Sequence, residues 1–182
     1  MPLFKRLFVG LPLPASSKEM IEELDPGLRG LRWLPASQLH LTLSFFGDIG
    51  QENEAALRES LSQVHVPTFF LPLQGVGFFK ARGRPSVVWV GVGKGHPHLF
   101  ALHKHIQDAV LHAGLEADLR SFHAHVTVAR SRGISTQELQ PWIRKHADED
   151  LGMFEVKEFI LYSSVLAPEG ATYAEELRVP LR

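Results

Sequence analysis

Two short stretches decide the fold: "LHLTLS" at residues 39–44 and "FHAHVTVAR" at residues 122–130. Each places a histidine, one spacer and a threonine within an apolar run that favours a β-strand. Side chains two residues apart in a strand share a face, so His40 lies beside Thr42 and His125 beside Thr127. The leucines and valines between them take the opposite face. Each stretch therefore predicts a strand with one polar face and one face in the core.

The elements expected around these strands occur twice in the same order. In the first half we expect a strand at 7–11, a helix from Ser16 or Ser17 to about 28, the strand at 39–46, a helix at 52–64 and an extended segment at 69–79. In the second half we expect a strand at 86–92, a helix at 98–113, the strand at 125–129, a helix from Ser135 to about 145 and a strand at 154–165. A final edge strand is expected at 171–181. If the halves pack about a pseudo-twofold axis, the two polar stripes face each other across a cleft.

Local signals refine this prediction. Ser135 precedes Glu138 by three residues, the spacing of a capping box. Pro141 is expected to kink or restart the helix that follows. Gly75 and Gly77 lie within an extended segment, where they indicate bulges or close approaches of the backbone.

Composition limits the class of protein. The chain has 182 residues and is 45% hydrophobic, enough to bury a core in one domain of one or two lobes. Its net charge of −1 argues against a large non-specific nucleic-acid surface, so any such contact should be local. The absence of cysteine excludes disulfides, thiolate zinc sites and a cysteine nucleophile. No apolar run or N-terminal leader pattern suggests a membrane, and we expect a soluble, cytoplasmic protein.

The paired His-x-Thr stripes suit displacement at phosphorus. That reaction takes a proton from the nucleophile and delivers one to the leaving oxygen on the opposite side, and imidazole can do either near neutral pH. Thr42 and Thr127 can donate hydrogen bonds to the phosphate oxygens. Arg130 adds a guanidinium fork for phosphate, although simple alternation does not place it on the face of His125. The chemistry requires neither a metal nor a cofactor.

Four segments carry a resemblance to a known family: "RLFVGLPLP", "RWLPASQLHLTLSFFGD", "FHAHVTVAR" and "LYSSVLAPEGATY". They resemble, over nearly the whole chain, the two-histidine phosphoesterases, and specifically the bacterial RNA 2',3'-cyclic phosphodiesterases, also called 2'-5' RNA ligases. The resemblance implies one bilobal α/β domain over residues 1–182, with two antiparallel sheets flanked by helices and a phosphate site between them. It implies His40 and His125 as catalytic residues, with Thr42, Thr127 and Arg130 at the phosphate. Ala124 departs from the family, which usually has proline before the second histidine.

The resemblance also implies the reaction. A 2',3'-cyclic phosphate at an RNA or oligonucleotide end is hydrolysed without metal to a 2'-phosphate, and the reverse reaction would join such an end to a 5'-hydroxyl. In this scheme His125 deprotonates the water and His40 protonates the departing 3'-oxygen. We expect a monomer that binds such RNA ends. Two alternatives stay open: hydrolysis of another small cyclic or 2'-5'-linked nucleotide, and a non-catalytic nucleotide-binding module, against which the two intact motifs argue.

Other histidines raise the question of a metal site. His98, His105 and His112 are seven residues apart, which spreads them along about 20 Å of helix, so they cannot share one ion. We expect them to be solvated. His123 shares a face with His125 by alternation and receives no role.

Basic and aromatic residues outside the motifs have two interpretations each. Lys80, Arg82 and Arg84 form either a solvated hairpin connection or a guide for the phosphates of an RNA end. The aromatic residues are expected in the core rather than as platforms for stacked bases. They are Trp33, Phe122 and Tyr173.

Overall fold

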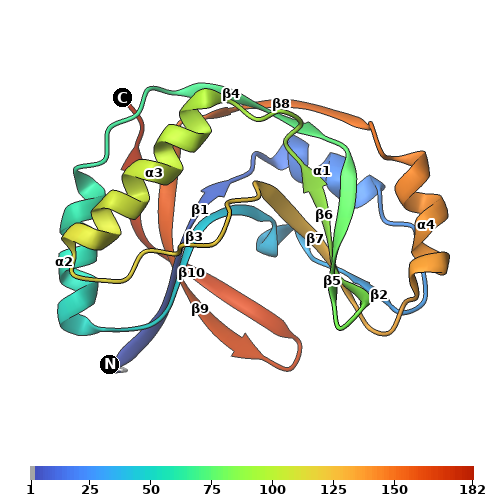
Figure 1. Ribbon diagram of the computed structural model, residues 1–182, viewed down its shortest axis with the longest axis horizontal. Coiled ribbons are helices and arrows are strands. Elements are labelled where there is room, and N and C mark those ends of the chain that lie inside the picture. Colours follow the sequence, from blue (N-terminus) through green and yellow to red (C-terminus); the bar gives the residue numbers. More distant parts are fainter. Residues whose placement is uncertain (1–2) are drawn as a thin grey trace.

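An antiparallel sheet of eight strands forms the centre of the protein, which a computed structural model describes over residues 3–182 (Figure 1). The strand order is β10-β9-β1-β3-β7-β6-β5, and β2 pairs with β7. The strands are β1 (Phe4–Pro12), β2 (Leu31–Trp33), β3 (His40–Gly50), β5 (Val76–Ala81), β6 (Arg84–Gly91), β7 (His125–Ser131), β9 (Glu158–Ala167) and β10 (Gly170–Pro180). A second sheet pairs β4 (Phe69–Gln74) with β8 (Asp150–Val156). The helices are α1 (Ala15–Glu23), α2 (Gln51–Ser62), α3 (Pro97–His112), α4 (Thr136–Lys145) and the short 3-10 helix η1 (Ala36–Gln38).

The large sheet consists of two antiparallel halves that meet at one point. β3 and β7 pair only at Leu41 and Val126, each directly after a motif histidine. The order strand, helix, strand, helix, strand occurs as β1-α1-β3-α2-β4 and again as β6-α3-β7-α4-β8, with β2 inserted in the first set. In Figure 1, α2 and α3 flank one side of the molecule and α1 and α4 the other. The predicted bilobal mixed α/β fold with repeated order is confirmed.

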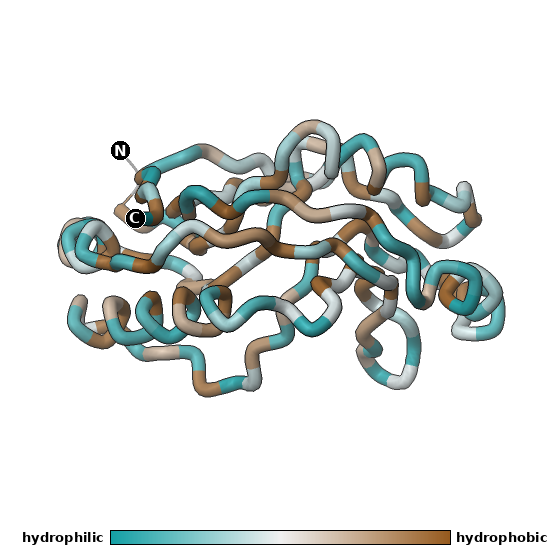
Figure 2. The backbone as a smooth tube through the Cα atoms, turned by 90° about the horizontal axis from the view of Figure 1, so that it is seen from above, coloured by the Kyte–Doolittle hydropathy of each residue, from teal (hydrophilic) through white to brown (hydrophobic). Residues whose placement is uncertain are grey.

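The core lies between the sheet and the helices. Leu41 and Val126 are fully buried, as expected for the apolar faces of the two motif strands. The predicted inward residues of α3 are all buried: Leu99, Leu102, Ile106, Ala109 and Val110. Figure 2 shows hydrophobic stretches along the strands and hydrophilic ones toward many turns. Within residues 3–182, no helix is long and apolar enough to cross a membrane.

Several local predictions are confirmed. Ser135 and Glu138 form the capping box of α4. A Cβ on Gly77 would lie 2.2 Å from the ring of Trp89, and one on Gly75 would lie 2.6 Å from the carbonyl oxygen of Ala147. These close approaches explain why the extended segment carries glycines. The segment is divided there into β4 and β5.

Other boundaries differ from the prediction. Helix α1 has Pro14 at its N-cap rather than Ser16 or Ser17, and it ends at Glu23 instead of continuing to 28. Gly27 (φ +61°) has a left-handed backbone that cannot continue the helix. The single strand predicted at 154–165 is wrong: β8 ends at Val156 and pairs with β4, whereas β9 pairs with β1 and β10. Helix α4 runs through Pro141 without restarting.

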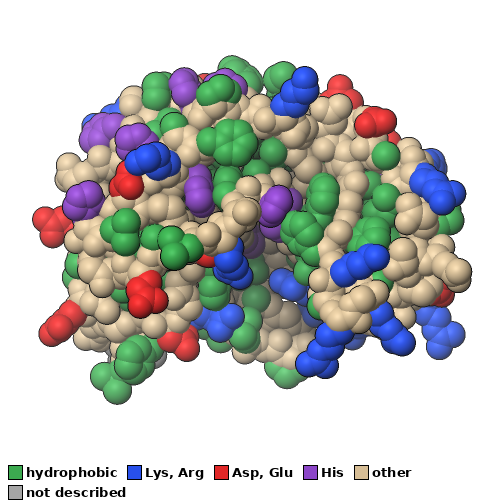
Figure 3. All heavy atoms as spheres, viewed as in Figure 1, with side chains coloured by type: hydrophobic (Ala, Val, Ile, Leu, Met, Phe, Trp, Pro, Cys, Tyr) green, Lys and Arg blue, Asp and Glu red, His purple; other side chains and the backbone are tan. Residues whose placement is uncertain are grey.

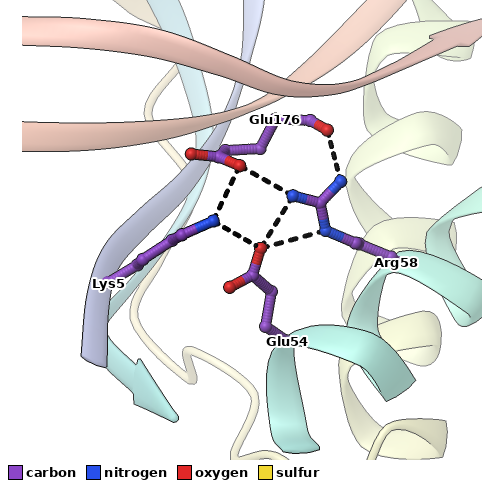
Figure 4. A network of polar contacts seen from close by, with 4 residues as sticks. All are labelled: Lys5, Glu54, Arg58 and Glu176. Atoms are coloured by element: carbon purple, nitrogen blue, oxygen red, sulfur yellow. Dashed lines mark hydrogen bonds and ion pairs between the residues drawn. The ribbon is translucent and has the colours of Figure 1, made fainter. Parts of the chain in front are cut away.

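An ion-pair network joins β1, α2 and β10 (Figure 4). Glu54 of α2 accepts from Lys5 Nζ at 3.0 Å and from Arg58 Nη2 at 2.7 Å. Glu176 of β10 accepts from the same two groups at 2.9 and 2.7 Å. Each charge therefore has two opposite neighbours, which offsets the cost of its partial burial. The network fixes α2 against β1 and β10.

Candidate active site

A cleft of about 460 Å³ lies between the halves and contains all five predicted site residues. They are His40, Thr42, His125, Thr127 and Arg130. Figure 3 shows histidine side chains near the centre of one face and basic side chains around the hollow below them. Because β3 and β7 pair only between Leu41 and Val126, the polar faces of both strands border the same opening. The predicted meeting of the two stripes is confirmed.

Backbone and side-chain contacts fix the ring of His40. Its Nδ1 lies 2.8 Å from the carbonyl oxygen of Gln38, so Nδ1–H donates there and Nε2 carries the lone pair. Nε2 lies 3.0 Å from Thr42 Oγ1, whose hydroxyl can donate to it. The rings of Phe8 and Tyr173 lie with centroids 4.8 and 5.1 Å from that of His40. Nε2 is thus the reactive nitrogen of a closely packed imidazole.

His125 is held in the same tautomer. Its Nδ1 lies 2.6 Å from the carbonyl oxygen of His123, which again leaves the lone pair on Nε2. The ring of Phe79 stands edge-on to it at 4.9 Å, and that of Trp89 lies at 6.5 Å. The two histidines therefore have matching orientations from opposite halves of the fold.

Burial lowers the pKa of both imidazoles. Burial lowers the pKa of His40 from its usual value of 6.5 to about 4, because it disfavours the charged form. The hydrogen bond to the carbonyl oxygen of Gln38 partly opposes this shift. Repulsion from nearby positive charges lowers the pKa further; these belong to His125, Lys18 and Arg130. Burial likewise lowers the pKa of His125, and the charge of His123 adds to the effect. A bound phosphate anion would raise both values, because it stabilises each imidazolium.

Two matching β-bulges direct further side chains into the cleft. In β3, Thr42 pairs with Gly10 and Ser44 with Val9, which leaves Leu43 as an extra residue. In β7 the equivalent extra residue is Val128, again three positions after the histidine. Each bulge reverses the alternation of its strand.

The residues five positions after the histidines, Phe45 and Arg130, consequently line the cleft. The prediction from the sequence left the direction of Arg130 open. The bulge at Val128 gives the structural reason for its position.

The cleft is more basic than the composition suggests. Arg6, Arg32 and Arg130 line it, and within the described part of the chain its lining includes no Asp or Glu. Arg32 on β2 pairs directly with Arg130 on β7, an arrangement of like charges that costs stability until an anion lies between them. Local sequence patterns do not point to Arg6 or Arg32, because only the pairing of distant strands brings these residues to the cleft.

Arg32 also connects the β9–β10 hairpin to the other half. Its guanidinium donates to the carbonyl oxygen of Glu169. Gly170 permits this contact, since a Cβ there would lie 2.5 Å from Arg32 Nη2, and its φ of +133° suits glycine. The hairpin, which projects below the sheet in Figure 1, thus borders the cleft.

The remaining candidate residues have mixed outcomes. Tyr173 lies in the cleft beside His40, so its assignment to the core is wrong. Phe122 is half-buried and stacks on His103 at 4.1 Å, and Trp33 packs edge-on to Trp142 at 5.9 Å.

The basic loop lies at an exposed hairpin turn. Arg82 (φ +51°) and Gly83 (φ +76°) connect β5 to β6 there. None of its basic residues lines the cleft: Lys80, Arg82 and Arg84. The contact of this loop with RNA phosphates stays a prediction.

The additional histidines do not gather around one point. His105 and His112 are exposed, as predicted, but His98 is half-buried and its ring lies 6.0 Å from Phe69. Across residues 3–182, no three His, Asp or Glu side chains are placed to hold a metal ion together. His123 contributes its carbonyl oxygen to the orientation of His125.

Comparison with known proteins identifies the family. The family model described as the 2'-5' RNA ligase superfamily matches residues 12–166, most of the chain. The chain belongs to this superfamily.

Curated members match it over nearly its full length. A protein of Archaeoglobus fulgidus named RNA 2',3'-cyclic phosphodiesterase is 35% identical over 178 residues, which cover 96% of this chain and 98% of that protein. The protein of the same name from Escherichia coli is 30% identical over 167 residues, covering 90% and 89%. Crystal structures of E. coli LigT superpose with TM-scores of 0.81 in the apo form and 0.80 with 3'-AMP, at 28% and 29% identity. The superposition on the apo form covers 99% of each chain, and that on the 3'-AMP complex covers 98% of each. This member of the 2'-5' RNA ligase superfamily is an enzyme, a cyclic phosphodiesterase.

Proposed function

We propose that this superfamily member hydrolyses 2',3'-cyclic phosphates at RNA or oligonucleotide ends to 2'-phosphates without a metal ion. The observation that carries this proposal is the pair of imidazoles, fixed in the same tautomer on two halves of one basic cleft. Two such groups supply both proton transfers of a displacement at phosphorus. The names of the curated relatives support RNA as the substrate class.

The proposed reaction proceeds in line. Water attacks phosphorus while His125 Nε2 takes its proton; the bond from phosphorus to the 3'-oxygen breaks, and His40 Nε2 delivers a proton to that oxygen. This division of roles is the one that the resemblance to the family implies. His40 Nδ1–H donates to a backbone carbonyl and Nε2 carries the lone pair, so Nε2 must take up a proton before His40 can act as the acid. The anionic phosphate favours that protonation because it stabilises the imidazolium.

Neighbouring groups would bind the phosphate. Thr42 and Thr127 lie on the faces of the two histidines and can donate to the non-bridging oxygens. Arg130 supplies a fixed charge and two parallel donors. With a 5'-hydroxyl in place of water, the same base and acid in the same roles would catalyse joining to a 2'-5' link. All these residues come from one chain, so we expect a monomer to be active.

Turnover of a 2',3'-cyclic mononucleotide in EDTA tests the proposal. We expect rapid turnover that EDTA does not change and a product that carries only a 2'-phosphate. Binding without turnover would instead support the non-catalytic module, and loss of activity in EDTA would show a metal requirement. A 3'-phosphate product would contradict the assigned leaving group.

A further inference from the structure

A second pocket, of about 230 Å³, shares His125 with the main cleft. Its walls are mainly aromatic: Phe79, Trp89, Phe100 and Phe122. Hydrolysis by water makes no use of it. We propose that this pocket binds the nucleobase of a nucleoside whose 5'-hydroxyl replaces water as the nucleophile. The inference rests on the proposed function and adds a binding site for the nucleoside that accepts the phosphate in the joining reaction.

The position of the pocket follows from the geometry of displacement. The attacking and leaving oxygens lie on opposite sides of phosphorus, so with the 3'-oxygen at His40 the nucleophile enters at His125. A group bonded to the nucleophile then lies on the His125 side of phosphorus, away from the departing 3'-oxygen. His125 lines both cavities, so the pocket begins where the nucleophile would enter. An acceptor nucleoside there would have its 5'-oxygen beside the proposed base.

The walls suit a flat heteroaromatic group. Phe79 stands edge-on to His125 at 4.9 Å, and Phe100 is edge-on to Phe122 at 6.3 Å. Phe122 is itself held in a parallel stack on His103, with 4.1 Å between centroids and 8° between planes. Rings fixed in this way present stacking surfaces to a base at little entropic cost, and every base has a face that can stack.

The charge of the pocket also suits a nucleic acid. Lys94 is exposed on its lining, and within the described residues no Asp or Glu contributes to it. A strand that continues from the 3' side of the acceptor nucleoside would carry its next phosphate past this lysine. An apolar peptide would gain nothing from Lys94 or from contact with His125. The occupant that accounts for both is a nucleoside.

The proposed transfer is balanced. A bond forms between the 5'-oxygen of the acceptor and phosphorus, and the bond from phosphorus to the 3'-oxygen breaks. The 5'-hydroxyl proton passes to His125 Nε2, and His40 Nε2 protonates the 3'-oxygen. The product is a 2'-5' phosphodiester with a free 3'-hydroxyl, and no further reactant is needed.

The test measures transfer against hydrolysis in the same reaction. Cytidine 2',3'-cyclic phosphate is the donor, and the acceptor is either adenosine or 1,4-anhydroribitol, which keeps the 5'-hydroxyl but has no base. We expect at least about tenfold more transfer per mole of adenosine, the contribution of one stacked base. Phe100→Ala removes a wall of the second pocket that does not line the main cleft. It should lower the yield of the transfer product with adenosine about tenfold and leave the rate of hydrolysis within about twofold of the wild type.

Phe70→Ala is the matched control. Phe70 of β4 is 58% exposed, similar to the 50% of Phe100, but it does not line the pocket. It should leave both rates at the wild-type level. Equal transfer to the two acceptors, or hydrolysis with no transfer to adenosine, would overturn the proposal. Loss of hydrolysis in the wild type would instead refute the proposed function.

Discussion

The buried neutral His40 should make the stability of the protein depend on pH. Its pKa is about 4 in the folded state, against 6.5 for an ordinary histidine. Between these values the unfolded chain binds a proton at this position and the folded chain does not, so stability falls as pH falls. The contribution of neutral His40 to the free energy of unfolding is fully present above about pH 7. About 2 kcal/mol of it is lost between pH 7.5 and pH 5, and about 3 kcal/mol is lost by pH 3.

His40→Asn isolates this contribution. Asparagine does not titrate, and its amide can still donate to the carbonyl oxygen of Gln38. Urea unfolding followed by circular dichroism at pH 7.5 and 5.0 gives the free energy of unfolding for each protein. The wild type should lose about 2 kcal/mol more than His40→Asn over this interval.

His105→Asn is the control for this measurement. Its histidine is exposed on α3 and does not line the cleft, so the variant should keep the wild-type pH dependence. The same loss of stability in His40→Asn as in the wild type, within about 0.5 kcal/mol, would refute the argument that burial keeps His40 neutral.

Three further changes have defined outcomes. Arg130→Lys should raise KM about tenfold in steady-state kinetics, because it keeps the charge but loses the paired donors; unchanged KM and kcat would remove Arg130 from the site. Gly10→Ala places a Cβ 3.3 Å from His40 Cδ2 and 3.1 Å from a carbonyl oxygen, so kcat should fall about tenfold with stability lowered by about 1 kcal/mol; wild-type kcat would show that the His40 ring tolerates displacement. Glu54→Gln should lower the free energy of unfolding by about 2 kcal/mol in urea and leave KM unchanged, since it removes the shared carboxylate of the ion-pair network; an unchanged stability would mean that the network is energetically neutral.

The alternation of side chains in the two motif strands was sufficient to predict the face of each His-x-Thr pair. His40 and Thr42 share a face because they are two residues apart in a strand, and Leu41 between them is buried on the opposite face. This local rule does not depend on the rest of the fold. Helix α3 was predictable for a similar reason, as its apolar positions recur with the helical period. The position of Arg130 was implied by the family resemblance but did not follow from the alternation of its strand, because the bulge at Val128 arises from the pairing of β7 with β6.

Long-range pairing accounts for the other differences. The run from Phe154 to Val165 is rich in residues that favour strands and was predicted as one strand. One residue, Lys157, instead separates two strands that belong to different sheets. Arg6, Arg32 and Tyr173 reach the cleft from β1, β2 and β10, so their roles depend on strand order rather than on local sequence. The early end of α1 had a local signal, since Pro26 and Gly27 follow shortly after Glu23.

A substrate with a different leaving group can show which of the two histidines is the acid and which is the base. His40→Ala and His125→Ala should each lower the rate on a natural 2',3'-cyclic nucleotide about 10²- to 10⁴-fold. A cyclic phosphate whose leaving oxygen is a good phenolate needs no proton as it departs. On that substrate His40→Ala should recover most of the wild-type rate, whereas His125→Ala should remain impaired. Rescue of His125→Ala alone would exchange the two roles, and rescue of neither variant would contradict the paired acid and base.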